Sequence, residues 1–428
     1  MQTTLADFLR ESKDAEEAKS IIEKCVHCGF CTATCPTYQL LGDELDGPRG
    51  RIYLMKQVLE GGEVTERTRT HLDRCLTCRN CESTCPSGVK YGRLVDIGRT
   101  IVDGQLQRVG MDRPLKERAV RWALREGLTR PRLFGTAMKI GRMLRPAMPS
   151  VLRHKIPLTK PEDEARAQRR ITHARKMLFL EGCVQPSMSP NINAATRNVM
   201  DKAGVELVAA RGVGCCGAIR FHTGDHGGGL DDMRRNIDAW WPHVSNGLNT
   251  ILVNASGCGL MVKEYGHLLR GDPDYAGRAA MVSHMTKDIS EVLPEFVTRL
   301  TTLGRKSNRD AVAYHPPCTL QHGQKVRGQV EQILGAFGIE TRLCADSHLC
   351  CGSAGTYSIL QPELSGRLRD DKLEKLTLTG ADAIVSANIG CISHLQGGTT
   401  KPVMHWIELI DQLLGEGDEF YEQLEAGG

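Results

Sequence analysis

Aromatic residues are scarce in this sequence, and long hydrophobic runs are missing. Phe, Trp and Tyr make up 5% of the 428 residues, and no known nucleic-acid-binding module is recognisable, which argues against DNA or RNA as a partner. No segment reaches the roughly 20 apolar residues that a membrane-spanning helix needs. The N-terminal stretch MQTTLADFLRESKDAEE is polar and lacks the apolar core of a secretory signal. We therefore expect a cytoplasmic protein in a reducing compartment.

Cysteine, by contrast, is abundant. The chain has 17 cysteines, which is above ordinary usage but below the density of small disulfide-stapled secreted domains. In a reducing compartment, clustered cysteines are metal ligands or redox groups more often than disulfides. Their spacing is therefore the most informative feature of the sequence.

Eight of the cysteines form two runs with identical spacing. CVHCGFCTATCP covers residues 25–36 and CLTCRNCESTCP covers residues 75–86, so each run reads C-x2-C-x2-C-x3-C-P. Bacterial two-cluster ferredoxins use this run to hold [4Fe–4S] clusters. Structural zinc more often uses two C-x2-C pairs separated by a long gap, and inert buried thiols need no fixed spacing. We therefore predict two [4Fe–4S] clusters.

The ligand sets of these clusters are predicted to cross between the runs. Three thiolates of a run converge on one cluster, and the fourth, beyond the wider gap, points to the other cluster. Cluster 1 is then bound by Cys25, Cys28, Cys31 and Cys85. Cluster 2 is bound by Cys75, Cys78, Cys81 and Cys35. The crossed ligands would tie the runs together and keep the clusters close enough for electron exchange.

The N-terminal 170 residues read as a helical domain followed by a basic connector. Residues 1–105 surround the cysteine runs, and PRGRIYLMKQVLEGG (residues 48–62) has the proline start, the glycine end and the apolar spacing of a helix. Residues 106–170 form the connector, with amphipathic segments RAVRWALREGL and LFGTAMKIGRMLR and a polar linker, TKPEDEARAQRR. Between residues 106 and 176 there are 19 Lys and Arg against 6 Asp and Glu, a net charge of +13. Such helices can lie on an anionic membrane, but we favour a solvated or partner-docking face.

The remaining chain is an internal duplication, residues 171–305 and 306–428. Cys183 precedes Cys215 by 32 residues, and Cys318 precedes Cys350 by the same interval. The predicted strands are KMLFLEGC, VELVAA and TILVNASGC in the first half and AVAYHPPC, ETRLCA and ADAIVSANIGC in the second. Helical segments lie between them, which indicates parallel sheets flanked by helices. The expected fold is therefore α+β multidomain: a helical ferredoxin-like domain with two [4Fe–4S] clusters, then two repeated α/β units, here named CCG domains after their Cys-Cys-Gly triplets.

The cysteines of the CCG domains all follow predicted strands. Parallel strands open at their C-termini onto one crevice where ligands bind, so these thiols should converge there. The candidate metal or redox ligands are Cys183, Cys215, Cys216 and Cys258 in the first domain and Cys318, Cys350, Cys351 and Cys391 in the second. This thiol density suits an iron–sulfur cluster or zinc; reversible thiol pairs and buried core cysteines stay open as alternatives. Gly217 and Gly352 would let the backbone approach this site closely.

Three further features bear on these sites. GVGCCG (residues 212–217) fits a dinucleotide loop, but its repeat partner HLCCGSAG loses the glycine spacing, so we do not expect a nucleotide there. Cys344 aligns with an alanine of the first repeat and is expected to be a core thiol. His315 aligns with Leu180; it could hydrogen-bond near the second thiol site, but we favour a position outside it.

The order of these motifs resembles the iron–sulfur subunits of bacterial glycolate oxidases. The resemblance covers nearly the full length: both cysteine runs, GPRGRIYLMKQVLEG, both CCG units and NIGCISHLQGGTTKPVMHWIEL. Heterodisulfide reductase subunits, the iron–sulfur subunit of anaerobic glycerol-3-phosphate dehydrogenase and lactate-utilisation proteins belong to the same wider family. The heterodisulfide reductases end each CCG unit in C-x-x-C, whereas here Met261 and His394 occupy the last position. Each unit thus lacks one thiolate, and we expect His394 to stay off the metal.

The resemblance implies an electron-transfer subunit without catalytic residues of its own. Taking two electrons from a hydroxy acid needs an acceptor such as flavin, so FAD would lie on flavoprotein partner subunits that oxidise glycolate to glyoxylate. The chain would pass electrons towards a quinone or membrane acceptor. It would lie in the cytoplasm or peripherally at the inner face of the cytoplasmic membrane. The alternatives are an iron–sulfur subunit of a lactate or glycerol-3-phosphate dehydrogenase, or a heterodisulfide-reductase-like protein with catalytic CCG domains. A redox sensor is disfavoured because it needs only one cluster.

Overall fold

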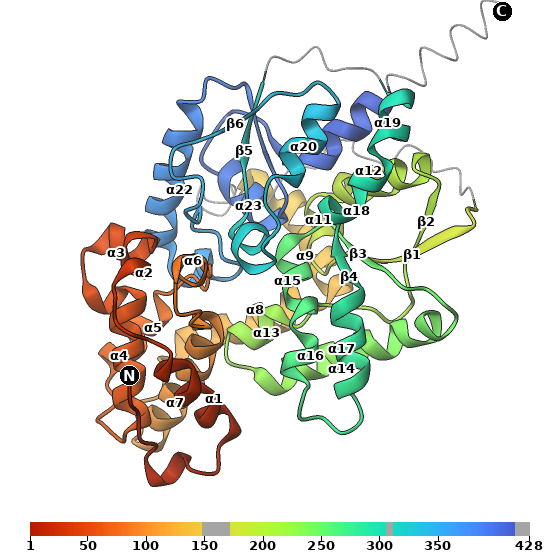
Figure 1. The fold of residues 1–428 in the computed structure, drawn as a ribbon. Coiled ribbons are helices and arrows are strands. Elements are labelled where there is room, and N and C mark those ends of the chain that lie inside the picture. The colour runs from red at the N-terminus through yellow and green to blue at the C-terminus, as the bar shows by residue number, and fades with distance from the viewer. Residues whose placement is uncertain (148–171, 305–310, 416–428) are drawn as a thin grey trace, which may run out of the picture.

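The computed structural model describes residues 1–147, 172–304 and 311–415. The predicted linker TKPEDEARAQRR lies outside these residues. Figure 1 shows a helical N-terminal region in red and orange, an α/β domain in green and a second α/β domain in cyan and blue. This arrangement confirms the α+β multidomain class, while the exact domain boundaries stay a prediction.

The helical region winds around the two cysteine runs. Its helices are α1 (Lys13–Glu23), α2 (Phe30–Ala33), α3 (Pro36–Leu41), α4 (Pro48–Leu59), α5 (Glu66–Asp73), α6 (Asn80–Thr84) and α7 (Tyr91–Arg108), with short 3-10 turns η1 (Asp7–Leu9) and η2 (Glu44–Asp46). The predicted helix after Pro48 is α4, and its apolar positions Ile52, Met55, Val58 and Leu59 are buried as their spacing predicts. These side chains share one core with α1, α5 and α7, which holds the cysteine loops between the helices.

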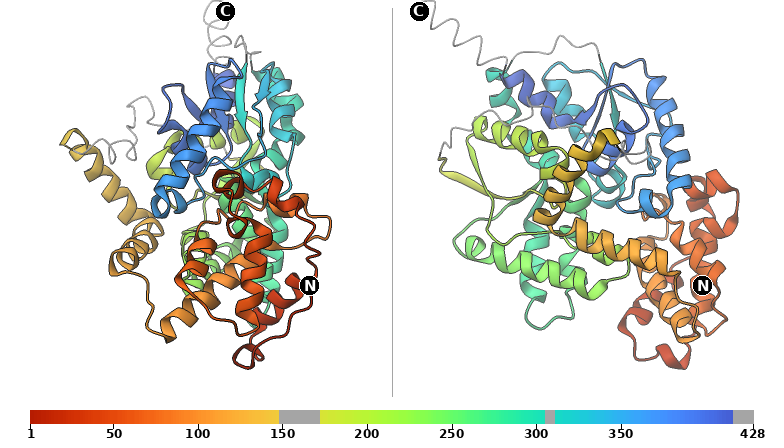
Figure 2. Two further views of the ribbon diagram at one scale, coloured as in Figure 1. Left: turned by 90° about the vertical axis from the view of Figure 1, so that its left-hand side faces the viewer. Right: turned by 180° about the vertical axis from the view of Figure 1, so that it is seen from behind.

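The connector forms two helices, α8 (Leu115–Leu128) and α9 (Pro131–Leu144), followed by the turn η3 (Arg145–Ala147). Figure 2 shows this pair, in orange and gold, on one side of the molecule, away from the sheets in its left-hand view. Within the described residues, no helix has both the length and the apolar character needed to cross a membrane. α8 has no buried residue and α9 has only Met138 and Gly141 buried, so both amphipathic segments lie at the surface.

The first CCG domain is a four-stranded parallel sheet with helices around it. Its strands are β1 (Arg175–Leu180), β2 (Val205–Val208), β3 (Ile251–Val253) and β4 (Thr286–Asp288), in the order β2-β1-β3-β4. Its helices are α11 (Gln185–Met188), α12 (Pro190–Lys202), α13 (Ala218–His222), α14 (His226–Ser245), α15 (Ser256–Lys263), α16 (Tyr265–Leu268), α17 (Ala276–Met285), α18 (Ile289–Val292) and α19 (Val297–Leu303), with the turn η5 (Leu293–Phe296).

The second CCG domain repeats this topology. Its strands are β5 (Val312–His315), β6 (Thr341–Leu343), β7 (Ala383–Ser386) and β8 (Val403–His405), again all parallel, in the order β6-β5-β7-β8. Its helical segments are η6 (Thr319–Gly323), α20 (Gln329–Ala336), α21 (Tyr357–Leu360), α22 (Pro362–Thr377) and α23 (Ile389–Gln396). In both sheets the strand order reverses between the first and third strands, which is where open α/β sheets bind ligands.

The two CCG domains pack tightly against each other. One hydrophobic core includes buried residues of both sheets. At the contact, the Ser256 amide donates to the Ala387 carbonyl at 3.1 Å, and His405 Nε2 lies 2.9 Å from the Asn254 carbonyl oxygen. The duplicated domains therefore form one body, against which the helical region is placed.

Candidate iron–sulfur and thiol sites

Both cysteine runs fold with the same unusual backbone. The residues on either side of the second cysteine have positive φ in each run: His27 (55°) and Gly29 (83°), then Thr77 (53°) and Arg79 (60°). A left-handed conformation costs a non-glycine residue roughly 1–2 kcal/mol, and such strain gathers at functional sites. The left-handed turns curl the chain around the thiols before α2 and α6 begin.

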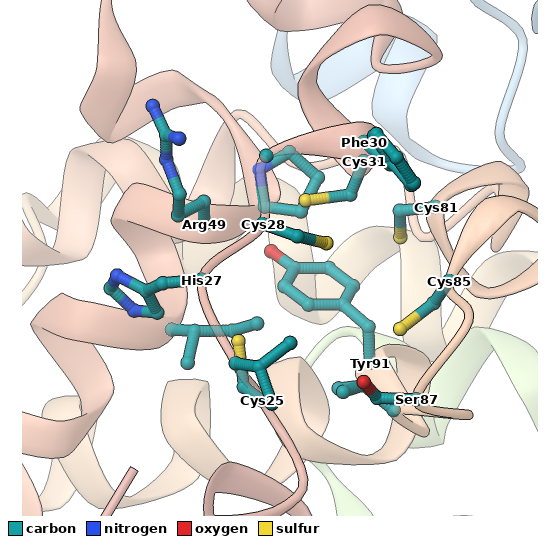
Figure 3. A pocket seen from close by; sticks show the side chains of 15 residues that line it. Cys25, His27, Cys28, Phe30, Cys31, Arg49, Cys81, Cys85, Ser87 and Tyr91 are labelled. Atoms are coloured by element: carbon teal, nitrogen blue, oxygen red, sulfur yellow. The ribbon is translucent and has the colours of Figure 1, made fainter.

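The first cavity collects the thiols predicted for cluster 1. It is lined by Cys25, Cys28, Cys31 and Cys85, together with Cys81 of the second run. Figure 3 shows their sulfur atoms pointing towards a common space beside the ring of Tyr91. Cys85 thus lies with the first run, as the crossed arrangement requires.

The second cavity collects the thiols predicted for cluster 2. It is lined by Cys35, Cys75, Cys78 and Cys81. Cys81 and Tyr91 line both cavities, so the two adjoin each other. The structure brings each predicted set together, and the assignment of each thiol to a cluster stays a prediction.

The chemistry of these cavities fits iron–sulfur clusters. Burial, and next the charge of the neighbouring Cys25, raises the pKa of Cys31 to about 11. Burial likewise raises the pKa of Cys78 well above its ordinary value, with Cys318 as the next cause. Several thiolates in so buried a place need cations beside them, which iron supplies. The buried Tyr91 hydroxyl has no hydrogen-bond partner within the described residues, so it is free to donate to a group in the cavity.

Short hydrogen bonds reach the sulfur atoms of the second set. The Thr77 amide donates to Cys75 Sγ at 3.3 Å. The Thr37 hydroxyl lies 3.3 Å from Cys35 Sγ and donates its own proton to the Asp46 carbonyl at 2.8 Å. Hydrogen bonds to cluster sulfurs are one determinant of reduction potential. These contacts would therefore tune cluster 2.

A buried arginine beside the second cavity is a feature that sequence reasoning missed. Arg51 lines this cavity, and its side chain and that of Asp46 are each 1% exposed, with Arg51 Nη2 3.3 Å from Asp46 Oδ1. Asp46 is also contacted by His71 at 3.0 Å and Arg74 at 2.8 Å. Arg51 sits one residue before the apolar face of α4, and its motif GPRGR gives no sign that the charge is buried. It places a fixed positive charge next to the second cavity.

The two cavities differ in their surroundings. At the first, Cys28 is exposed, and Val26, Phe30 and Tyr53 are 69%, 59% and 47% exposed. This apolar surface, here called the cluster 1 patch, consists of Val26, Phe30 and Tyr53. The first cavity therefore borders solvent.

The second cavity is covered by the second CCG domain. Leu76 and Cys78 pack in one apolar cluster with Cys318 and Cys350. Asn80 Nδ2 donates to the His348 carbonyl at 3.2 Å, which fastens α6 to the same domain. The thiols of cluster 2 and those of the second CCG domain are thus neighbours, a juxtaposition that no local sequence signal reveals.

In the first CCG domain the four candidate thiols form a contiguous chain. Cys183 is hydrogen-bonded to Cys215, Cys215 to Cys216, and Cys216 to Cys258. The hydrogen bonds from Cys183 and then Cys216 hold the pKa of Cys215 well below its ordinary value, although burial opposes this. Cys215 is therefore the thiol in this domain that most favours the thiolate form.

The second CCG domain has the same chain of thiols. Cys318 Sγ lies 3.9 Å from Cys350 Sγ, and Cys350 and Cys391 are each hydrogen-bonded to Cys351. What either set binds stays a prediction. Cys344 is buried in the hydrophobic core, as expected of a core thiol.

The glycine of each triplet is required by the backbone. Gly217 and Gly352 have φ values of 90° and 89°, and a Cβ atom would lie 2.8 Å from the Gly229 carbonyl oxygen or 2.6 Å from that of Ser365. Both the conformation and the contact exclude a side chain. These close contacts are with the backbone of α14 and α22, and the predicted approach of the glycine backbone to the thiol site stays a prediction.

The position of His315 differs from the one that we favoured from the sequence. Its ring lies with Cys351 and Cys391, and one ligand atom from each of the three falls within 4.8 Å of the others. The prediction that His315 lies outside the thiol site is wrong, because the alignment with Leu180 indicated only a buried position at the strand end. That position adjoins the thiols. His394 Nε2 lies 3.1 Å from the Ser365 hydroxyl, and its expected place off the metal stays a prediction.

Comparison with known protein families supports these sites. A 4Fe-4S dicluster domain matches residues 21–89. A cysteine-rich domain matches twice, at residues 177–263 and 312–396. The first match contains both ferredoxin-type runs, and the two others contain the CCG triplets.

Curated relatives match over most of the chain. The glycolate oxidase iron–sulfur subunit of Escherichia coli K12 is 51% identical over 415 residues, 97% of this chain and 99% of that protein. A probable glycolate oxidase iron–sulfur subunit of Bacillus subtilis 168 is 33% identical over 88% of this chain and 89% of that protein. Lactate utilization protein A of Bacillus cytotoxicus is 24% identical over 55% of this chain and 98% of that protein. This chain belongs to the family of glycolate oxidase iron–sulfur subunits.

Proposed function

We propose that this chain is the electron-transfer subunit of a glycolate-oxidising complex. Flavin-bearing partner subunits would oxidise glycolate to glyoxylate, and this chain would receive the electrons one at a time and pass them towards a quinone at the membrane. The observation that carries the proposal is the pair of adjoining thiol-lined cavities, which share Cys81 and Tyr91. A [4Fe–4S] cluster in each cavity supplies one-electron chemistry, which converts two-electron flavin oxidation into single steps.

The direction of electron flow follows from the different surroundings of the cavities. The first borders solvent and carries the cluster 1 patch, whereas the second is covered by the second CCG domain. Exposed aromatic and aliphatic groups beside a redox centre suit a protein partner. We therefore place electron input from the flavoprotein at the first cavity.

Replacing Phe30 with aspartate should weaken binding of the flavoprotein partner at least about tenfold, because a central interface aromatic is worth about 2 kcal/mol or more. Phe30 is 59% exposed, so its removal leaves the core intact. Titration of the partner by calorimetry or surface plasmon resonance measures the change. Leu378, which is 79% exposed after α22, provides the control in Leu378→Asp. Equal partner affinity for both variants would place the interface elsewhere.

The membrane side of the proposal rests on α8 and α9. Between residues 115 and 144 there are eight Lys and Arg against two Glu, and Leu115, Trp122 and Met143 are 80%, 66% and 74% exposed. Helices that expose both cationic and apolar side chains bind anionic membranes, because the cations contact the lipid headgroups and the apolar groups enter the membrane interface. The exposed apolar side chains favour a lipid surface over the solvated or partner-docking face expected from the sequence. This surface would hold the chain at the inner face of the cytoplasmic membrane, next to a quinone acceptor.

The substrate assignment is tested by comparing electron donors. The complex is purified with its native partners without oxygen, and glycolate, lactate and glycerol 3-phosphate are added separately while the visible iron–sulfur absorbance is followed. We expect glycolate alone to bleach it rapidly. Bleaching by lactate or glycerol 3-phosphate in place of glycolate would move the chain to a sibling dehydrogenase.

A further inference from the structure

His315 is a buried imidazole whose ring nitrogens have no hydrogen-bond partner in the part of the chain that the structure describes. The residue is 0% exposed, and both Nδ1 and Nε2 are without partners. His405, also 0% exposed, contacts the Asn254 carbonyl at 2.9 Å and the Ile407 amide at 3.1 Å. Leaving buried polar atoms unpaired is costly. An unpaired buried imidazole therefore points to a group that it binds.

The side chains around His315 are soft donors. Nitrogen of His315 and sulfur of Cys351 and Cys391 lie within 4.8 Å of one another, and all three residues are buried. Asn388 Nδ2 lies 3.7 Å from Cys391 Sγ, where it supports a negative sulfur. Two thiolates and one imidazole are a donor set that binds zinc, with a fourth position for water or another thiol. Cys350, hydrogen-bonded to Cys351, is a candidate for that position.

The first CCG domain lacks this donor set. The position equivalent to His315 is Leu180, a core residue that is 1% exposed. The strand end that supplies His315 in the second domain therefore supplies no imidazole nitrogen beside the four thiols of the first domain. The duplicated domains have the same fold but different chemistry.

We propose that His315, Cys351 and Cys391 bind one divalent metal ion of the zinc class, in the second CCG domain alone. The ion ties the end of β5 to the Cys-Cys-Gly loop and to α23. These segments lie behind Cys318 and Cys350, which pack against Leu76 and Cys78 of the second cluster run. The ion thereby fixes the wall of the second cavity without itself exchanging electrons.

The test is the metal content of the full-length chain, purified without oxygen and without added chelator, by mass spectrometry. We expect about one zinc per chain beside about eight irons. His315→Leu, which installs the residue of the first domain, should reduce zinc to below about a tenth and leave iron unchanged. Cys391→Ser should do the same. Cys344→Ser, a buried thiol of the same domain outside the site, should retain zinc.

X-ray absorption at the zinc edge of the unaltered protein gives a second readout that depends on no variant. We expect sulfur neighbours at about 2.3 Å and nitrogen at about 2.0–2.1 Å. Absence of zinc, zinc surrounded by sulfur alone, or zinc retained in His315→Leu would overturn the proposal, as would additional iron in its place. Glycolate plays no part in either measurement, so the outcome is separate from that of the proposed function.

Discussion

Cys28→Ser is expected to remove cluster 1 and leave cluster 2 assembled. Iron should fall from about eight to about four per chain, because each cubane holds about four irons. Glycolate-driven electron transfer should stop, because the input centre is lost. Cys28 is exposed, so the substitution disturbs little packing. Iron analysis and electron paramagnetic resonance of the dithionite-reduced protein measure the loss. Retention of both cluster signals would contradict the ligand assignment.

The crossed arrangement makes a sharper prediction about pairs of variants. Cys85→Ser should abolish the same signal as Cys28→Ser, although Cys85 belongs to the second run, because both line the first cavity. Cys35→Ser should abolish the same signal as Cys78→Ser, because both line the second cavity. If the ligands were not crossed, Cys35→Ser would abolish the signal of cluster 1 and Cys85→Ser that of cluster 2. The four variants together are therefore matched controls for one another.

The second large effect is expected from Arg51→Met. Removing one member of a buried charge network typically costs about 3–5 kcal/mol, because the partner charge is left uncompensated. Arg51 contacts Asp46 in a network where both are 1% exposed. The loss of a positive charge beside the second cavity should also lower the reduction potential of cluster 2 more than that of cluster 1. Urea denaturation and potentiometric titration give the two quantities.

The control lies on the same helix. Lys56 pairs with Glu60 at i,i+4 spacing, with 21% and 32% of the two side chains exposed. Such surface pairs contribute about 0.3–0.5 kcal/mol, so Lys56→Met should have little effect on stability and none on potential. Equal stability losses for the two variants would show that the buried network carries no special weight.

The sequence predicts the features that depend on local spacing. The ferredoxin-type runs are recognisable because thiol spacing alone determines how the chain curls around a cluster. The internal repeat likewise predicts both parallel sheets, since a strand that ends in cysteine recurs at the same interval. The strands β4 and β8 escape this reasoning. Each has three residues, too few to show a pattern in the sequence. They are strands because β4 pairs with β3 and β8 pairs with β7.

The site residues that the sequence does not reveal depend on long-range contacts. Arg51 is buried only because Asp46 and the second cavity surround it. Tyr91 lies between the cavities because α7 begins there, and nothing in its neighbours marks it. His315 belongs to the second thiol site because the end of β5, the Cys-Cys-Gly loop and α23 converge there, whereas the alignment with Leu180 indicates only burial. The exchange of leucine for histidine at this position therefore gives the second domain a donor that the first domain does not have.

The most direct test of the account is to ask whether electrons from glycolate reach this chain. The complex, purified without oxygen with its native flavoprotein partners, receives glycolate while both cluster signals are followed by electron paramagnetic resonance, and a soluble quinone is then added. We predict that both clusters are reduced within the turnover time and reoxidised by the quinone, and that the Cys28→Ser complex keeps cluster 2 oxidised. Flavin reduced by glycolate while both clusters stay oxidised would contradict the assignment of this chain to the electron path.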